Sequence, residues 1–146
     1  MCDEVLSGIF RQMFAIDFTN GPFDSLDDLV TITGGGTPPR DTPEYFTGTI
    51  PWFTSKDLKT SLIWDTEEHI TEAAITQSAT KLVPAGSILI VVKSKVLMHR
   101  LPIAKTMVPL CHGQDIKSMQ CSSRILPDFL RFAERCILFP DEKPLL

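Results

Sequence analysis

The amino-acid sequence predicts an α+β domain, and three observations support this fold class. Residues 87–92 are apolar at almost every position, which is typical of a central strand buried on both faces. Other short β-branched or apolar runs follow at varied spacing, as in a sheet of short strands. Apolar residues at helical spacing occur near the two ends of the chain. A chain of 146 residues is long enough to bury the core of one such domain.

The N-terminal region predicts one helix and one short helical turn. In residues 3–16, the apolar side chains that share a helical face are Val5, Leu6, Ile9, Phe10, Met13 and Phe14. This stripe favours a core or subunit contact over a ligand site. Residues 20–22, Asn-Gly-Pro, end the helix. Ser25 is the candidate N-cap of a short turn through Leu29, which leads into a strand at 30–33.

Three consecutive glycines at 34–36 end this strand, and Pro38-Pro39 keeps the following chain extended. Because the Gly-Lys-Ser/Thr of a nucleotide-binding loop is missing, the glycines favour a tight turn over an anion site. Residues 50–53, Ile-Pro-Trp-Phe, predict a stiff apolar anchor with Trp52 buried. The polar residues that follow directly are Thr54, Ser55, Lys56 and Asp57. A rigid support of this kind can aim polar side chains at a ligand.

The rest of the chain predicts short strands, turns and two helices. We expect strands at 61–64, 87–92, 102–104, 106–108 and 116–119, an acidic loop at 65–68, turns at 82–86 and 111–115, and helices at 72–78 and from Pro127. Thr71 is the candidate N-cap of the helix at 72–78. Lys93, Ser94 and Lys95 follow the central strand and are expected to be exposed. Lys81 precedes the turn at 82–86 and is therefore expected at the opposite end of that strand.

Charge is distributed unevenly along this chain of formal net charge −4. Residues 1–78 carry 13 acidic and 4 basic side chains, a balance of −9. Residues 79–124 have a balance of +6, in which Asp115 alone opposes the bases Lys81, Lys93, Lys95, Arg100, Lys105, Lys117 and Arg124. Local potential governs docking, so a basic third can hold a polyanion even in an acidic protein. A solvated face of lysines is the alternative, and charge alone leaves it equally open.

The sequence argues against metal, membrane and catalytic sites. The four cysteines form no Cys-x-x-Cys pair, and Cys111-His112 has no second pair with which to bind a metal. The longest apolar run, 88–92, is too short to span a bilayer, and the N-terminus lacks a signal-peptide pattern, which favours the cytoplasm. Motifs of nucleases, methyltransferases and hydrolases are missing. We therefore expect neither catalysis nor a cofactor.

Several motifs occur in an order that points to one protein family. They are Gly35-Gly-Thr-Pro38 with Ile50-Pro-Trp52 and Asp57-Leu58, then Ile70-Thr71 with Ala74 and Ser78, then residues 81–90 (Lys-Leu-Val-Pro-Ala-Gly-Ser-Ile-Leu-Ile), then Leu101-Pro-Ile-Ala104, and last Gln114-Asp-Ile-Lys117. Over residues 26–138 the chain resembles the target-recognition domain of type I restriction–modification specificity subunits.

The resemblance implies a small, strongly curved mixed β-sheet with flanking helices. It also implies sequence-specific binding of double-stranded DNA, with catalysis left to partner methyltransferase (modification) and nuclease/translocase (restriction) subunits. Full subunits of this kind carry two recognition domains joined by long helices, so one domain implies a homodimer or a second recognition domain. The expected divisions are residues 1–20 as an N-terminal helix resembling the end of a spacer helix, 21–126 as the target-recognition domain, and 127–146 as a C-terminal helix and tail.

Loop residues beside stiff strands supply the candidate DNA-binding side chains. In the major groove, lysine pairs with guanine, glutamine with adenine and aspartate with cytosine. The candidates are Gly36, Thr37, Thr54, Ser55, Lys56, Asp57, Lys93, Ser94, Lys95, Gln114, Asp115 and Lys117. Gln114 and Lys93 are the leading candidates for base contacts, whereas Asp57 has the alternative of bonding loop backbone to hold Trp52 in place. In the resembled family asparagine commonly precedes the glutamine, where this chain has Gly113.

Two alternatives to DNA recognition stay open at this point. One is a protein-interaction module that uses the helical stripe of Leu6, Ile9, Phe10 and Met13, with the basic third only solvated. The other is a truncated remnant of a specificity subunit without a working DNA site, because Gly113 and the missing long helices depart from the family pattern.

Overall fold

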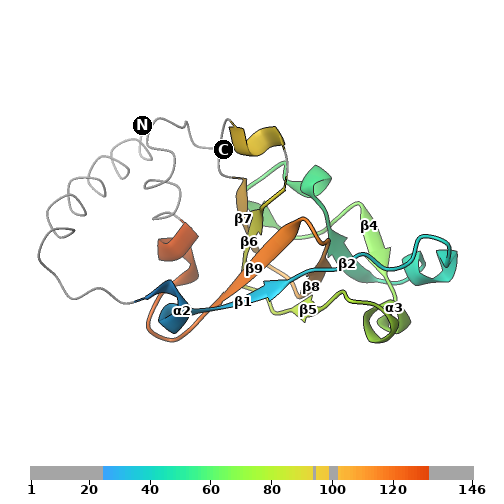
Figure 1. Ribbon diagram of the computed structural model, residues 1–146, viewed down its shortest axis with the longest axis horizontal. Helices are drawn as coiled ribbons and strands as arrows, with labels where there is room; N and C mark the ends of the chain where they lie inside the picture. Colours follow the sequence, from blue (N-terminus) through green and yellow to red (C-terminus); the bar gives the residue numbers. More distant parts are fainter. Residues whose placement is uncertain (1–24, 94, 99–101, 132–146) are drawn as a thin grey trace, which may run out of the picture.

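The computed structural model describes residues 25–93, 95–98 and 102–131, whose strands form two mixed sheets (Figure 1). The five-stranded sheet has the order β1 (Val30–Gly34), β9 (Ile116–Cys121), β6 (Ile88–Val91), β7 (Ile103–Thr106) and β3 (Leu62–Ile63). The four-stranded sheet has the order β4 (Glu68–Ile70), β2 (Ile50–Phe53), β8 (Leu110–His112) and β5 (Leu82–Val83). Each sheet contains one parallel pair, β3 with β7 and β2 with β8.

Helical structure in the described residues is limited to short pieces. They are α2 (Leu26–Leu29), α3 (Glu72–Gln77) and the 3-10 turns η1 (Pro43–Phe46), η2 (Ser55–Asp57) and η3 (Lys95–Met98), together with a helix that begins at 127 and is described to 131. Leu130 of that last helix packs against Val30 and Leu29, beside α2. These elements confirm an α+β fold with mixed sheets. The single, strongly curved sheet is not confirmed, since the described strands divide between two sheets and neither closes on itself.

The central position of the strand predicted at 87–92 is confirmed. Strand β6 lies between β9 and β7 and pairs antiparallel with both. Its residues Ile88, Leu89 and Val91 are at most 1% exposed. A strand that is covered on both faces needs apolar side chains at successive positions, and this is the pattern that the sequence carries.

The two predicted caps behave differently. Thr71 caps α3, because its side chain accepts a hydrogen bond from the backbone N–H of Ala74 at 3.3 Å. Ser25 stands at the N-cap of α2 without a side-chain bond, and only its carbonyl accepts from the N–H of Asp28, at 3.0 Å. A helix of one turn has little stability of its own. The tertiary contacts of α2 include Leu29, which packs against the cluster that contains Leu130 and whose carbonyl accepts a hydrogen bond from the N–H of Ser122 at 2.8 Å.

Some predicted elements are wrong in extent. The strands expected at 102–104 and 106–108 are one strand, β7, because Lys105 continues the ladder opposite Ile88. Part of the turn expected at 111–115 belongs to β8, and part of the acidic loop at 65–68 belongs to β4. Strand β5 falls inside the turn expected at 82–86. Such short strands have too few residues to show a periodicity. The helix expected at 3–16 lies outside the described residues.

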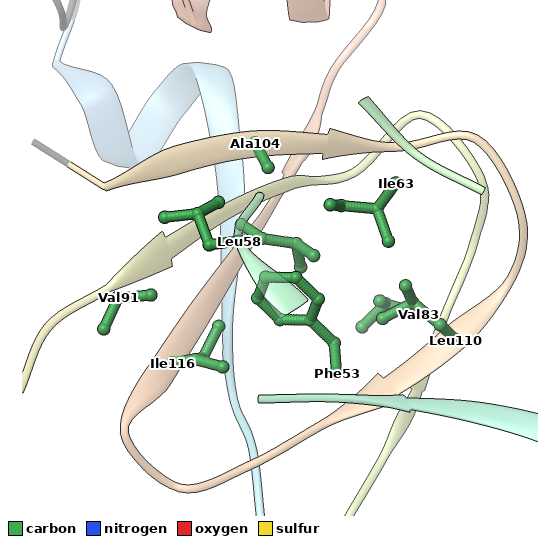
Figure 2. Packing of buried hydrophobic residues seen from close by; sticks show 9 residues of the cluster. Phe53, Leu58, Ile63, Val83, Val91, Ala104, Leu110 and Ile116 are labelled. Atoms are coloured by element: carbon green, nitrogen blue, oxygen red, sulfur yellow. The ribbon is translucent and has the colours of Figure 1, made fainter. Parts of the chain in front are cut away.

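One hydrophobic cluster joins the two sheets (Figure 2). Its members are Phe53, Leu58, Ile63, Val83, Leu89, Val91, Ala104, Leu110 and Ile116. Phe53 comes from the four-stranded sheet and is fully buried, whereas Val91 and Ile116 come from the five-stranded sheet. Side chains alternate along a strand, so Trp52 points away from this cluster and packs instead with Ile70 of the neighbouring strand β4. Its predicted burial is confirmed at 3% exposure.

Candidate nucleic-acid interface

Four strands, β1, β2, β6 and β8, end at the same edge of the fold, where β9 begins. Strands β2 and β8 run parallel, so their last residues, Phe53 and His112, stand opposite each other. After the turn at 113–115 the chain enters β9, whose first residue, Ile116, pairs with the last residue of β6, Val91. The next residue of β9 is paired with the end of β1. The segments that leave these strands therefore gather at one place, although they lie far apart in the sequence.

Main-chain hydrogen bonds tie the gathered segments together. The N–H of Gly36 donates to the carbonyl of His112 at 3.0 Å, and the N–H of Gly113 donates to the carbonyl of Phe53 at 2.9 Å. The N–H of Val92 donates to the carbonyl of Asp115, also at 2.9 Å. We refer to residues 34–37, 54–57, 92–93 and 113–117 as the loop cluster. These three hydrogen bonds hold the backbone of the loop cluster in place, and none of them involves a side chain.

The structure brings most of the predicted DNA-binding residues into the loop cluster. Those with exposed side chains are Thr37, Ser55, Lys56, Lys93, Gln114 and Lys117, those partly covered are Thr54 and Asp115, and those buried are Gly36 and Asp57. Lys95 is exposed just beyond the cluster, in η3. Ser94 lies outside the described residues. The assembly of these side chains on one edge arises from the strand pairings and could not be read from their spacing in the sequence.

Asp57 uses both carboxylate oxygens within the protein. Oδ2 accepts from the N–H of Thr54 at 2.8 Å and from its hydroxyl at 2.9 Å, and Oδ1 accepts from the N–H of Glu67 at 2.8 Å. The sequence left open that Asp57 holds loop backbone, and the contacts are of that kind. The bond to the backbone of Trp52 comes instead from Thr66, whose hydroxyl accepts from the Trp52 N–H at 3.0 Å.

The glycines at 34–36 do not form the tight turn that the sequence favoured. Among the described residues, positive φ occurs only at Gly86, before β6. Instead, Gly35 and Gly36 are required by close approach. A Cβ on Gly35 would lie 2.3 Å from the carbonyl oxygen of His112, and one on Gly36 would lie 2.5 Å from the backbone of Thr80. The segment after β1 can thus lie against β8 only because these residues lack side chains.

Arg40 is a neighbour of the cluster that the sequence did not reveal. Its guanidinium lies 4.3 Å from the ring centre of Phe46 and 4.9 Å from that of Trp52. Arg40 also makes a bidentate ion pair with Glu68, with N–O distances of 2.5 and 2.8 Å. The hydrogen bond from Arg40 lowers the pKa of Glu68. Trp52 in turn donates from Nε1 to the carbonyl of Gly36 at 3.1 Å, so these contacts hold the segment after β1 in place.

His112 is fully buried beneath the cluster. Its Nε2 lies 3.0 Å from the hydroxyl of Ser118, and its Nδ1 lies 3.3 Å from the carbonyl of Gly113. Burial lowers the pKa of His112, and the positive charge of Lys117 lowers it further. The side chain is therefore a neutral structural group at pH 7 that links β8 to β9. In the same strand, burial raises the pKa of the Cys111 thiol to about 11, which makes it a packing group.

The position predicted for Lys81 is wrong. Lys81 directly precedes β5, which pairs antiparallel with β8, with Leu82 opposite Cys111. Next to it, the hydroxyl of Thr80 donates to the carbonyl of His112 at 3.4 Å. Lys81 therefore stands at the end of β8 from which the loop cluster extends, on the same side as Lys93. A two-residue strand such as β5 has no periodicity that distinguishes it from a turn in the sequence, and its pairing reverses the chain between 81 and 93.

The lysines at this edge form no ion pair with the carboxylates of the described residues, although hydrogen bonds lower the pKa of Glu67 and Glu68 and the charge of the neighbouring Lys56 lowers it further. These lysines are Lys56, Lys81, Lys93, Lys95 and Lys117. Elsewhere, basic side chains do have acidic partners, for example Lys59 with Glu67 and Lys105 with Asp128, both at 2.6 Å. Cations gathered on one edge create a local positive potential, although the whole chain is acidic.

The described residues contain no group of three or more His, Cys, Asp or Glu side chains that could hold a metal ion. In the same part of the chain, no helix combines the length and the apolar composition needed to cross a bilayer. What the site offers is hydrogen-bond donors and acceptors, positive charge and a fixed backbone.

Comparison with known proteins now gives the family. The chain is 42% identical over 98 residues to the specificity subunit of the type I restriction enzyme EcoR124I/EcoR124II of Escherichia coli. It is 30% identical over 110 residues to the specificity subunit of the type I restriction enzyme MjaIX of Methanocaldococcus jannaschii. This chain is a homologue of type I restriction enzyme specificity subunits. The resemblance inferred from the motifs is thereby confirmed, and both relatives are specificity components, in agreement with the expectation that the chain is not itself an enzyme.

The homology covers part of each protein. The matches include 66% and 73% of this chain but only 24% of each specificity subunit, so the chain spans about a quarter of the length of these relatives. Solved structures agree on the fold. The HsdS subunit from Thermoanaerobacter tengcongensis matches with a TM-score of 0.64 and 15% identity, over 96% of this chain and 36% of that one. A second structure, from work on complex assembly and conformational transition of a type I restriction–modification system, matches with a TM-score of 0.54 and 16% identity. That match covers 87% of this chain and 32% of the other. No family model matches the chain.

The close approach of the segment after β1 predicts opposite responses at two glycines. Gly36→Ala should lower the free energy of unfolding by about 1–3 kcal/mol, because its Cβ would overlap backbone atoms that cannot move aside. Gly113→Ala is the matched control, since its Cβ would meet nothing nearer than 3.7 Å. It should leave stability unchanged or raise it by up to about 1 kcal/mol. Urea unfolding of both variants tests this, and equal losses would contradict it.

The buried His112 predicts a loss of stability on mild acidification of this specificity-subunit homologue. Because burial lowers its pKa from the ordinary 6.5, the unfolded chain binds a proton there more readily than the folded chain does. The contribution of neutral His112 to the free energy of unfolding is therefore fully present above about pH 6.5, and it is lost as the pH decreases below that value.

Unfolding free energies at pH 7.5, 6.5 and 5.5 should decrease in that order, and the decrease should be smaller in His112→Gln. The pKa values of Asp65, Glu67 and Glu68 are lowered from ordinary values near 4, so these groups titrate below this range. An identical pH dependence in the variant would show that His112 is not its source.

Proposed function

We propose that this chain binds double-stranded DNA sequence-specifically, as a target-recognition domain of a type I restriction–modification specificity subunit. The observation that carries the proposal is the loop cluster. At or beside this one edge, five lysines that form no ion pair with the described carboxylates accompany exposed hydrogen-bonding side chains on a fixed backbone. Phosphate contacts require the cations, and base reading requires donors and acceptors held in place. The homology to specificity subunits supports the same function.

Within the proposal, individual side chains take different roles. Gln114 and Lys93, exposed at strand ends, are the leading candidates for base contacts with adenine and guanine. Lys56, Lys81 and Lys117 provide the charge for phosphate contacts. Asp57 and Gly36 are buried, so their part is to hold the loops rather than to touch DNA.

The chain would direct catalytic partners and would perform no chemistry itself. It would direct methyltransferase and nuclease/translocase subunits, in the cytoplasm. Residues 21–126 would form the recognition domain, with residues 1–20 as an N-terminal helix that resembles the end of a spacer helix and residues 127–146 as a C-terminal helix and tail. Since the chain spans about a quarter of the subunits that it matches, a homodimer or a second recognition domain would complete the assembly.

DNA binding should depend steeply on salt. If about four or five lysines touch phosphates, log affinity should fall against log salt with a slope of about −0.9 per contact. Lys56→Ala should make this slope shallower by about one contact, for all DNA sequences alike. The matched control is Lys105→Ala, which also removes one positive charge. Lys105 lies on β7 and pairs with Asp128, so this variant should leave the slope unchanged. A gel shift with random-sequence duplexes across a salt series measures both. A flat response in the wild-type chain would contradict DNA binding through this edge.

Sequence discrimination should depend on the leading base-contact candidates. Gln114→Ala and Lys93→Ala should each reduce the difference in binding free energy between cognate and random duplexes by about 1–3 kcal/mol, because a good base contact contributes that much discrimination. Lys105→Ala again serves as the control and should leave this difference unchanged. The cognate site comes from selection among random duplexes. If both variants select the wild-type consensus with an unchanged difference, base reading lies elsewhere.

A further inference from the structure

Val92 is an apolar side chain exposed within the polar loop cluster. It is 44% exposed, whereas the preceding residue, Val91, is 1% exposed in the core. The chain therefore changes at this point from the hydrophobic cluster between the sheets to the surface. Single exposed apolar residues are common on proteins, so exposure alone carries no functional meaning.

The position of Val92 gives its exposure significance. Its N–H donates to the carbonyl of Asp115 at 2.9 Å, which holds it beside the turn that presents Gln114. Lys93 follows it directly. Both neighbours are the residues for which the sequence and the strand ends indicate base contacts. Val92 is thus a short, stiff methyl-bearing side chain whose backbone is fixed next to two residues with hydrogen-bonding side chains.

We infer that Val92 contacts the 5-methyl group of a thymine in the major groove. This inference rests on the proposed DNA-binding function and deepens it. Among the four bases only thymine presents a methyl group there, and apolar side chains are its usual contact. Glutamine reads adenine through N6 and N7. Val92 is bonded to Asp115, the residue that follows Gln114, so together Val92 and Gln114 favour A·T pairs at neighbouring positions of the recognised sequence.

The test removes the methyl group from the DNA and from the protein in turn. A cognate duplex is selected with the full 146-residue chain, and each thymine in it is then replaced by uracil, which changes only the 5-methyl group. For the wild-type chain, one replacement should weaken binding about fourfold, the equivalent of ~0.8 kcal/mol for one buried methyl-sized group.

The protein variants Val92→Ser and Val92→Thr form a matched pair, since both carry a hydroxyl and only threonine keeps a methyl. The serine variant should bind the thymine and uracil duplexes equally, and the threonine variant should keep the wild-type preference. The exposed Leu62 on β3 provides a control outside the cluster, and Leu62→Ala should also keep the preference. Thermal unfolding verifies that each variant is folded.

The outcomes separate this inference from the function on which it rests. If the chain selects a consensus but no uracil replacement weakens wild-type binding, the methyl contact is wrong while sequence-specific binding stands. If a replacement weakens wild type and Val92→Ser alike, another residue makes the contact and the assignment of Val92 is overturned. If the chain selects no consensus at all, the proposed function fails, and the inference fails with it.

Discussion

The parallel pairing of β2 with β8 is the constraint on which the rest of the structure depends. It sets Phe53 opposite His112 and lets the N–H of Gly113 reach the carbonyl of Phe53. Phe53 then fills the space between the two sheets, while Trp52 on the opposite side of the strand supports the segment after β1. Without this pairing, the loops from the two sheets would not meet at one edge. Core packing and the candidate interface therefore arise from the same contact.

The sequence predicted the elements that carry their own pattern. The apolar run of β6 identified a buried central strand, and the motif at 50–53 identified a buried tryptophan beside polar loop residues. Thr71 is identifiable as a cap because the hydroxyl of a threonine directly before a helical segment can accept a hydrogen bond from an N–H of the first turn. In each case local propensity and tertiary burial agree, which is the condition under which reading from sequence succeeds.

The features that the sequence could not reveal depend on contacts between distant segments. The ion pair of Arg40 with Glu68 spans 28 residues, and the side of the fold on which Lys81 lies is set by the pairing of a two-residue strand. The role of Gly35 and Gly36 was misread for the same reason: a glycine required by a positive φ and one required by a close neighbour are identical in sequence. Their neighbours here, His112 and Thr80, come from β8 and from the segment before β5. Val92 was read as the end of a strand, and only the bond to Asp115 places it among the loop residues.

The main-chain bonding of the loop cluster separates the scaffold from the surface that it presents. Its three ties join N–H and carbonyl groups, which every residue except proline supplies, so they do not depend on which side chains stand at Thr37, Ser55, Lys93 or Gln114. Those positions can be exchanged without a change in how the chain folds. Under the proposed function, a chain built in this way could acquire a new DNA preference through single substitutions at the edge, while the buried partners beneath it stay as they are.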